Sequence, residues 1–395
     1  MFNLNRPLIT NHFTITDSIR DLKEELPEQT SEFLRRDYLL ALEEAAPPGL
    51  SFRYLSHKKG RKSDLLFYFQ VINLSSREVG QIVHFEPYSK MMSGISMLIQ
   101  NLLFGVKKDK PHYLVVCGNM CLSGEYGVVA PAEVKDKTAE LLMEAVQCVN
   151  RELDKKGKVV ANIVKDYPSE LDPYGNILKS RKFNALVMDP IMKMEIRSHW
   201  NRFDDYLADL SAKYRQRFLQ ARKKIADFEI RSLSETDLIR LKPRLDVLYK
   251  AVQDKSPVRL IKTDAAYLIS LSRHLGEKIT FKGIFKEGEL LAFLCGIHAG
   301  DHYEAHHIGI DYHYNKSHSL YLNLLYLYIE MAIANRVSLL SFGRTALEMK
   351  TTVGAVPHAY NAYIKLSNSL LNSISSHLLP AEASSNWIPR NPFRQ

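Results

Sequence analysis

Glu304 and His306 are the first residues whose types and spacing could support proton transfer. They stand two positions apart in the run HYEAHHIGID. In a β-strand, residues two apart point to the same face, so Glu304 and His306 would share a face and His307 would lie on the other. Histidine titrates near neutral pH, which makes His306 the better base, with Glu304 orienting it. The alternative is that His306 and His307 form a structural hydrogen-bonded pair.

A second group, Arg344, Glu348 and Lys350, lies in the segment SFGRTALEMKTTVGA. This segment begins with a short run that we predict to be a buried strand. A guanidinium can donate two parallel hydrogen bonds, so Arg344 is a candidate to bind a carboxylate or a phosphate. The alternative is an ion pair between Arg344 and Glu348 that braces the loop. Asp311 and Tyr312, at the end of the strand that carries His306, border the same predicted cleft and are further candidates to bind substrate.

Neither the remaining histidines nor the cysteines have the spacing of metal ligands. The histidines in question are His298, His302, His313 and His318, and the cysteines are Cys117, Cys121, Cys148 and Cys295. No spacing among them matches a recognisable zinc site, so we predict no metal. We expect the cysteines to be buried free thiols in a reducing compartment. This expectation favours a cytoplasmic protein.

The composition is that of a globular protein with an excess of positive charge. The 395 residues are 46% hydrophobic and 25% charged, and 53 Lys and Arg stand against 44 Asp and Glu, for a formal charge of +9. A basic balance favours an anionic partner, such as a nucleotide cofactor, an anionic membrane surface or RNA. We find no signal peptide and no run of about 18 apolar residues that could span a bilayer.

The elements that must position these residues lie between Ile279 and Gly354. Three runs rich in β-branched and aromatic residues are separated by tight turns at Lys286–Glu289 and Ala299–Asp301, which is typical of an antiparallel meander. The segment Leu320–Asn335 is apolar almost all round, which predicts a helix buried against the sheet. Ser338–Phe342 is the next predicted strand.

A long helix is predicted over Phe203–Ala226, ahead of the meander. Its apolar residues recur every three or four positions, at Phe203, Leu207, Leu210, Tyr214, Phe218, Ala221 and Ile225. The basic residues of its other face are Lys213, Arg215, Arg217, Arg222, Lys223 and Lys224. This face is either simply solvated or a surface for the phosphates of a cofactor, a lipid headgroup or tRNA.

The first half of the chain alternates predicted strands and helices, which indicates an α/β unit. Asp64–Leu74 and Tyr113–Met120 are strands, and a helix begins near Pro131 with Ala139, Leu142, Ala145 and Val146 on one face. The segment Pro87–Lys110 also has helical periodicity and is flanked by lysines. It is either a core or lid helix or an element that lies in a membrane interface.

Three stretches of the second half resemble the tandem-GNAT acyltransferases of the FemAB-like group. FDDYLADLSAKYRQRFLQARKK is similar to the segment ahead of the group's second GNAT half, and ITFKGIFKEGELLAFLCGIHAGDHYEAHHIGID is similar to that half's central strands. SFGRTALEMKTTVGA is similar to the group's late FGR(S/T)…K…G element; the matching residues are Phe342, Gly343, Arg344, Thr345, Lys350 and Gly354. The resemblance covers residues 200–366, and the first half only in architecture.

This resemblance implies an α/β (α+β) fold of two GNAT-like domains, each a mixed, mostly antiparallel central sheet flanked by helices. We expect an N-terminal domain over residues 1–195, with an apolar helical insertion near 90–105. We expect a C-terminal domain over 196–395 as the catalytic half, with a surface tail over 384–395.

The resemblance further implies acyl transfer from a thioester donor, either acyl-CoA or acyl carrier protein. In ordinary GNAT enzymes a glycine-rich loop after the fourth strand opens a helix whose amides hold the CoA pyrophosphate. The corresponding segment here, HYNKSHSLYLN, contains no glycine. Helix N-terminal amides together with Lys316, Ser317 and Ser319 could still bind the donor's phosphates.

The sequence therefore predicts an N-acyltransferase that acts on an amine, with His306 as base and Glu304 orienting it or binding the amine. The apolar segment Met91–Phe104 and the basic charge suggest a lipid acceptor at an anionic membrane surface. One alternative is aminoacyl-tRNA-dependent transfer to a cell-wall precursor. Another is a non-catalytic module that binds a lipid or a peptide.

Overall fold

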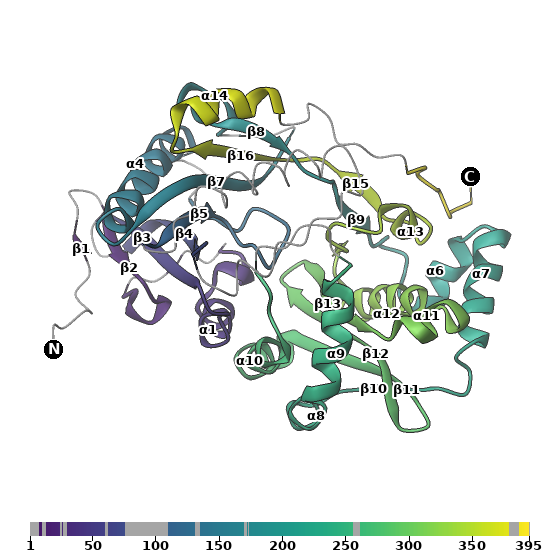
Figure 1. Ribbon diagram of the computed structural model, residues 1–395. Helices are drawn as coiled ribbons and strands as arrows, with labels where there is room; N and C mark the ends of the chain where they lie inside the picture. The colour runs from purple at the N-terminus through teal and green to yellow at the C-terminus, as the bar shows by residue number, and fades with distance from the viewer. Residues whose placement is uncertain are drawn as a thin grey trace. The chain divides into compact units, whose positions relative to one another are not determined.

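The chain folds into two compact units in a computed structural model (Figure 1). The structure describes residues 8–9, 13–23, 26, 30–59, 62–75, 110–130, 135–169, 172, 174–255, 261–378 and 387–394. Unit 1 comprises Met1–Asp189, Pro257–Lys262 and Ala359–Ser384, and unit 2 comprises Pro190–Ser256, Thr263–His358 and Ser385–Gln395. The chain therefore enters each unit more than once.

Unit 1 is built on one sheet, which has nine strands within the described residues. The strand order is β1-β2-β3-β4-β5-β7-β16-β8, with β6 paired to β4, and every pair is antiparallel except β5 with β7. The strands are β1 (Leu8–Ile9), β2 (Phe13–Thr16), β3 (Leu50–Lys59), β4 (Lys62–Asn73), β5 (His112–Cys117), β6 (Val128–Val129), β7 (Lys158–Pro168), β8 (Asn184–Val187) and β16 (Tyr360–Leu366).

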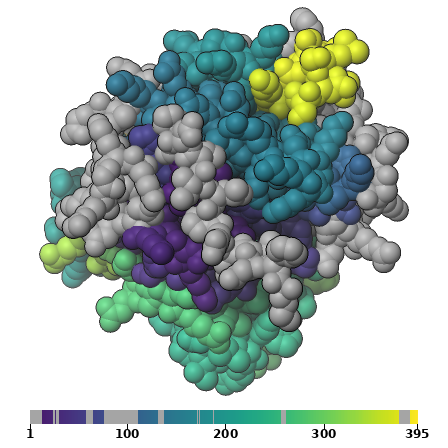
Figure 2. All heavy atoms as spheres, turned by 90° about the vertical axis from the view of Figure 1, so that its left-hand side faces the viewer, coloured from purple at the N-terminus to yellow at the C-terminus, as the bar shows by residue number. Residues whose placement is uncertain are grey.

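The helices of unit 1 pack apolar faces against this sheet. They are α1 (Arg36–Glu44), α4 (Lys135–Leu153), α5 (Gly175–Ser180) and α14 (Ser369–Leu378). The residues predicted to face the core from α4 are all buried, and they pack with side chains of β4, β5 and β7. α14 lies at the surface of unit 1, in yellow in Figure 2, where Asn184 of β8 donates a hydrogen bond to the carbonyl of Asn372.

Unit 2 is built on a second sheet, of seven strands in the described residues, in the order β10-β11-β12-β13-β14-β9-β15. The strands are β9 (Ile191–Glu195), β10 (Glu229–Ser232), β11 (Ile279–Lys286), β12 (Glu289–Ala299), β13 (His302–Ile310), β14 (Leu339–Ser341) and β15 (Val356–His358). All pairs are antiparallel except β13 with β14. The predicted meander is confirmed as β11, β12 and β13.

The helices of unit 2 are α6 (Phe203–Asp209), α7 (Ala212–Lys223), α8 (Glu235–Arg240), α9 (Lys242–Gln253), α10 (Ala265–Leu275), α11 (Tyr312–His318), α12 (Leu320–Ala334) and α13 (Leu347–Thr351). Nearly every side chain of α12 is buried, as its all-round apolar sequence predicts. α12 packs against β12, β13 and β14, and α9 packs against β12 and β13.

The single helix predicted over Phe203–Ala226 is wrong, because it is two helices that meet at Leu210–Ser211. Both of these residues have extended backbone conformations. The Leu210 carbonyl leaves the helical pattern and accepts hydrogen bonds from the side chains of Arg215 and Arg394. The apolar periodicity survives the break, since Tyr206, Tyr214 and Phe218 are buried in one core.

The two compact units differ from the predicted division at residue 195. Residues after Ala359 were expected in the C-terminal domain, but β16 lies between β7 and β8 in the sheet of unit 1. Ten residue pairs with β7 and β8 hold β16 there. Conversely, β9 forms antiparallel pairs with β14 and β15 in unit 2.

Most of the segment predicted as a lid or membrane helix, Pro87–Lys110, lies outside the described residues. Residues 379–386, which precede the C-terminal segment 387–394, also lie outside the described residues. No helix in the part of the chain that the structure describes is long and apolar enough to cross a membrane.

Candidate functional site

β13 and β14 pair only at one end, which leaves part of the β13 edge open. The parallel pairs are His302 with Leu339, Tyr303 with Leu340 and Glu304 with Ser341. β14 then ends, while β13 continues to Ile310. Among the described residues, no strand pairs with this edge of β13 after Glu304. Such an edge presents backbone donors and acceptors in the spacing of an extended chain.

A β-bulge distorts β13 at the same place. Cys295 of β12 is opposite His307, but the next residue, Gly296, is opposite Ala305, so His306 is an extra residue. The Tyr328 hydroxyl of α12 lies 2.9 Å from the carbonyl oxygens of both Cys295 and His307. The predicted alternation of side chains between the two faces of the strand is therefore wrong after Ala305. The extra residue moves each following side chain to the face opposite to the predicted one.

His306 and His307 consequently lie together against α9 and α10. Their ring centroids are 3.9 Å apart, and the Tyr267 hydroxyl of α10 is 3.0 Å from His306 Nε2. The His307 ring also contacts Tyr267 and Tyr249 of α9, at 5.7 and 5.1 Å between centroids. Burial lowers the pKa of His306 to about 3, so this imidazole is neutral at pH 7.

Glu304 is grouped instead with His302 and Lys350. The carboxylate is buried, with Oε2 3.9 Å from His302 Nε2, and it interacts electrostatically with the Lys350 side chain. Burial lowers the pKa of His302 to about 4, helped by the nearby charge of Lys193. The structure thus places the two predicted catalytic residues in adjacent groups on the same strand.

Lys350 holds the loop that follows β14. Its Nζ donates to the carbonyls of Phe342, Gly343 and Arg344, at 2.6, 3.2 and 2.6 Å. Burial lowers the pKa of Lys350 to about 7. Three acceptors can be satisfied together only by an ammonium with three N–H groups, so this geometry favours the protonated form. Lys350 therefore shapes the loop that contains Arg344.

The segment after β13 has its helix amides capped by its own side chains. Asp311 Oδ1 accepts from the backbone N–H of His313 at 3.0 Å, and Asn315 Oδ1 accepts from that of Tyr321 at 2.9 Å. Asp311 also pairs with Arg244 at 2.8 Å. The backbone N–H groups of His313 and Tyr321 therefore already have side-chain acceptors.

The other residues predicted near this segment are distributed around α11. Lys316 and Ser317 are exposed. Ser319 lies between α11 and α12, where its hydroxyl is 3.2 Å from Lys224 Nζ, and the ring of Tyr312 lies under Lys255 Nζ at 3.5 Å.

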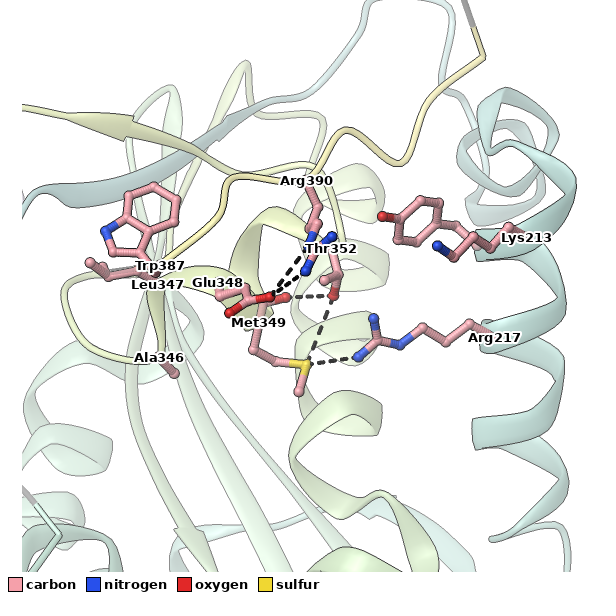
Figure 3. A pocket seen from close by; sticks show the side chains of 10 residues that line it. Lys213, Arg217, Ala346, Leu347, Glu348, Met349, Thr352, Trp387 and Arg390 are labelled. Carbon is pink, nitrogen blue, oxygen red and sulfur yellow. Dashed lines mark hydrogen bonds and ion pairs between the residues drawn. The ribbon is translucent and has the colours of Figure 1, made fainter. Parts of the chain in front are cut away.

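A pocket of about 640 Å³ opens on unit 2 (Figure 3). Its lining comes from α7, from the start of α13 and from the C-terminal segment: Lys213, Tyr214, Arg217, Ala346, Leu347, Glu348, Met349, Thr352, Trp387 and Arg390. Glu348 Oε1 accepts from Arg390 at 2.9 Å, so the partner of Glu348 is in the C-terminal segment. Arg217 Nη2 is 3.1 Å from the Met349 sulfur.

Trp387 and Arg390 are residues that sequence reasoning did not select. The tail over 384–395 was expected only to be a surface segment. Its aromatic residues were the available signal, because Trp387 and Phe393 are costly to leave in water. Phe393 packs against Trp200 and Tyr206, with centroids 5.7 and 6.2 Å apart.

All four cysteines are free thiols, and Cys117, Cys148 and Cys295 are buried. In the described part of the chain, no cluster of three or more His, Cys, Asp or Glu side chains could hold a metal ion.

Residues 212–351 match the family model of the acetyltransferase (GNAT) domain. The structure of FemX has a TM-score of 0.51 to this chain at 11% identity, and the match covers 87% of this chain and 94% of FemX. A tandem GNAT protein from the clavulanic acid biosynthesis pathway has a TM-score of 0.47 at 11% identity, with coverage of 84% and 87%. L-PGS from Bacillus licheniformis has a TM-score of 0.44 at 10% identity, with coverage of 86% and 95%. No match to a curated protein sequence was found.

The prediction of a GNAT domain in the second half is confirmed for residues 212–351, and the predicted resemblance to FemAB-like tandem-GNAT proteins is confirmed at the level of the fold, which FemX shares over most of the chain. The predicted fold class is also confirmed, since both sheets are mixed, mostly antiparallel and flanked by helices. The domain match begins in α7 and ends in α13, the two helices that line the pocket.

Proposed function

We propose, from the GNAT domain in unit 2, that the protein is an N-acyltransferase that moves an acyl group from a thioester donor to an amine acceptor. The donor would be acyl-CoA or acyl carrier protein. The observation that carries this proposal is the open edge of β13 beyond Glu304, next to the bulge at His306. The thioester arm of either donor is a chain of amides, and an extended chain of amides can pair with a free strand edge.

The reaction needs an amine nucleophile, a hydrogen-bond donor to the carbonyl oxygen and a route for one proton. The amine nitrogen bonds to the acyl carbon, the carbon–sulfur bond breaks, and the thiolate takes up the proton that the amine loses. Backbone N–H groups on the open edge of β13 are suitable donors to the carbonyl oxygen.

His306 and Glu304 would have different roles toward the amine: His306 in proton transfer and Glu304 in binding. His306 is neutral at pH 7, so it can accept a hydrogen bond from the amine and pass the proton on, with Tyr267 fixing its ring. A pKa this far below 7 makes His306 a weak base, so it would carry the proton only in passing to the thiolate. Glu304, two residues earlier on the strand, would attract the cationic form of the acceptor.

The test is thiol release from acyl-CoA and acyl carrier protein donors of several chain lengths, with a panel of amine acceptors. His306→Ala should reduce kcat by about 100-fold or more, the usual size of a lost acid–base contribution. His313→Ala is the matched control, because His313 is an exposed histidine on α11. Unchanged turnover in the His306 variant, with intact folding, would remove His306 from the mechanism.

The nature of the acceptor is part of the same proposal. A lipid amine at an anionic membrane surface fits the formal charge of +9. The apolar segment Met91–Phe104, which suggested it, lies outside the described residues. Product formation that depends on anionic vesicles would support this acceptor, and equal rates in free solution would contradict it.

Aminoacyl-tRNA-dependent transfer to a cell-wall precursor is the second candidate, favoured by the basic surface of α7. Lys213, Lys223 and Lys224 are exposed on or next to this helix. Turnover that RNase abolishes would select this reaction over transfer from a thioester. Absence of turnover with every donor, together with a lipid or peptide that co-purifies, would indicate a non-catalytic binding module.

A further inference from the structure

We infer that the pocket formed by α7, α13 and the C-terminal segment binds the phosphate-bearing nucleotide end of the acyl donor. This inference rests on the proposed function, because it names the carrier that the transferase uses. It selects a nucleotide carrier such as CoA over a carrier protein. It also places the phosphates away from the strand–helix junction after β13, where the sequence predicted them.

The charges that line the pocket suit a phosphate. Lys213 and Arg217 are one helical turn apart, so they lie on the same face of α7 and reach toward α13 (Figure 3). Arg390 enters from the C-terminal segment. Glu348 is the one acidic residue in the lining, and Arg390 already pairs with it at 2.9 Å. Neither Lys213 nor Arg217 pairs with a carboxylate of the lining, so both could bind a phosphate. Arg390 could also bind it while still paired with Glu348.

The rest of the lining suits a flat apolar group beside the phosphates. Trp387, Tyr214, Leu347 and Met349 supply aromatic and aliphatic surface. Nucleotide bases stack on aromatic side chains, which contributes about 1–3 kcal/mol per base. The volume of about 640 Å³ is within the range of small-molecule sites. A concave pocket of this size admits a nucleotide, whereas a membrane surface would meet a flat or convex basic face.

α13 connects the pocket, along the chain, to the loop beside the proposed reaction site. Leu347, Glu348 and Met349 line the pocket, and the next residue, Lys350, holds the loop Phe342–Arg344 after β14. β14 in turn pairs with β13 at Glu304. A donor anchored in the pocket would therefore lie against the helix and loop that lead to the open edge of β13.

The helix amides after β13 are less suited to phosphate. The N–H groups of His313 and Tyr321 already have side-chain acceptors in Asp311 and Asn315. Asp311 is itself paired with Arg244, whereas Lys213 and Arg217 line the pocket and pair with no carboxylate of its lining.

The experiment is calorimetric titration of the full-length protein with CoA, adenosine 3′,5′-bisphosphate and inorganic phosphate. The double variant Lys213→Ala/Arg217→Ala should weaken CoA and bisphosphate binding by at least about tenfold, because it removes two charge-assisted contacts. The matched control, Lys155→Ala/Lys223→Ala, also removes two exposed positive charges, one just after α4 and one on α7, and should change affinity by less than about twofold.

A third variant, Glu348→Gln, tests the sign of the effect. It removes the one carboxylate of the lining and releases Arg390 to the ligand, so nucleotide affinity should increase by about threefold or more. Damaged folding cannot produce a gain in affinity. Unchanged or weaker binding by a folded Glu348→Gln protein would contradict the inference.

Three further outcomes would overturn the inference. One is loss of nucleotide binding in a separate Lys316→Ala variant but not in the pocket variant, which would place the phosphates at α11. In another, the native protein binds no nucleotide but binds phosphatidylglycerol vesicles, and the pocket variant no longer binds these vesicles. This result would assign the cations to a lipid headgroup. The third is no nucleotide binding while acyl carrier protein still supports turnover, in which case the proposed function stands without this carrier. Nucleotide binding in the pocket without turnover on any amine would support the site and contradict the function.

Discussion

Lys350 and His306 show what residue type reveals and what only structure adds. Both are recognisable in the sequence as functional candidates, since one belongs to the FGRT element and the other to a His-rich strand. Their partners are not recognisable, because these come from the fold. Lys350 contacts three carbonyls of its own loop, and His306 contacts a tyrosine 39 residues away in the chain. The sequence therefore identified Lys350 and His306 as candidates, but it did not identify the groups that they contact.

The buried histidines of β13 predict that acid destabilises unit 2. Burial lowers the pKa of His306 to about 3 and that of His302 to about 4, whereas both titrate near 6.5 in an unfolded chain. Between these values the unfolded state binds more protons, so the free energy of unfolding decreases as the pH is lowered from about 6.5 to about 4. The decrease is at most about 1.4 kcal/mol per pH unit for each histidine.

Urea denaturation at several pH values, followed by tryptophan fluorescence, measures this effect. Trp200 and Trp387 are the chain's two tryptophans and both belong to unit 2, so the signal reports on that unit. His306→Gln should reduce the dependence on pH, and His313→Gln, on the exposed face of α11, should leave it unchanged. Equal slopes in the native protein and the His306 variant would refute the assignment.

At the scale of elements, the sequence predicted which strands and helices exist better than where they are interrupted. Periodicity identified the meander and the buried helix α12. It did not reveal the bulge at His306, because the strand HYEAHHIGI mixes polar and apolar residues on both faces, and one extra residue breaks no clear alternation there. The break at Leu210–Ser211 was hidden for a similar reason, since the apolar face continues across it.

The bulge depends on the absence of a side chain at position 296. A Cβ on Gly296 would lie 2.3 Å from a ring carbon of Tyr303, which is itself buried and cannot move aside. Gly296→Ala should therefore reduce stability by about 1–3 kcal/mol, the usual cost of overpacking, and disturb the edge proposed to bind the donor.

Chemical denaturation and the thiol-release assay would measure the two effects of Gly296→Ala. The double variant Gly296→Ala/Tyr303→Leu should recover part of the stability, because the shorter side chain removes the collision. If the two substitutions are simply additive, the collision is not the cause.

At the scale of the whole molecule, the two units were predictable from composition and resemblance, but their boundaries were not. The sequence placed one division near residue 195, and the two units of the structure interleave instead. Strand β16 reads as an ordinary closing strand of the second half. Its place between β7 and β8 depends on long-range pairing, which leaves no local pattern in the sequence.

Truncation of the chain after His358 should therefore damage unit 1 more than unit 2. The deletion removes β16 and leaves the facing edges of β7 and β8 without their pairing partner. Hydrogen exchange should show loss of amide protection in Asn184–Val187 and at those amides of Lys158–Pro168 that face β16, while the amides that face β5 stay protected. A chain that ends after Leu378 keeps β16 and α14 and is the control, with protection of both strands retained. Protected amides in β8 after truncation at His358 would contradict this prediction, because β16 is the one described strand that pairs with β8.

The place of β16 also sets an order of assembly during synthesis. A chain emerges from the ribosome N-terminus first, and an N-terminal domain ordinarily completes its fold before the next one has been made. Here the sheet of unit 1 stays incomplete until residues 360–366 have emerged, by which time every strand of unit 2 is already available. Unit 1, which begins the chain, can therefore complete its sheet only after the described strands of unit 2 have been synthesised. During that interval, β7 and β8 are exposed strand edges that nascent-chain chaperones would have to protect.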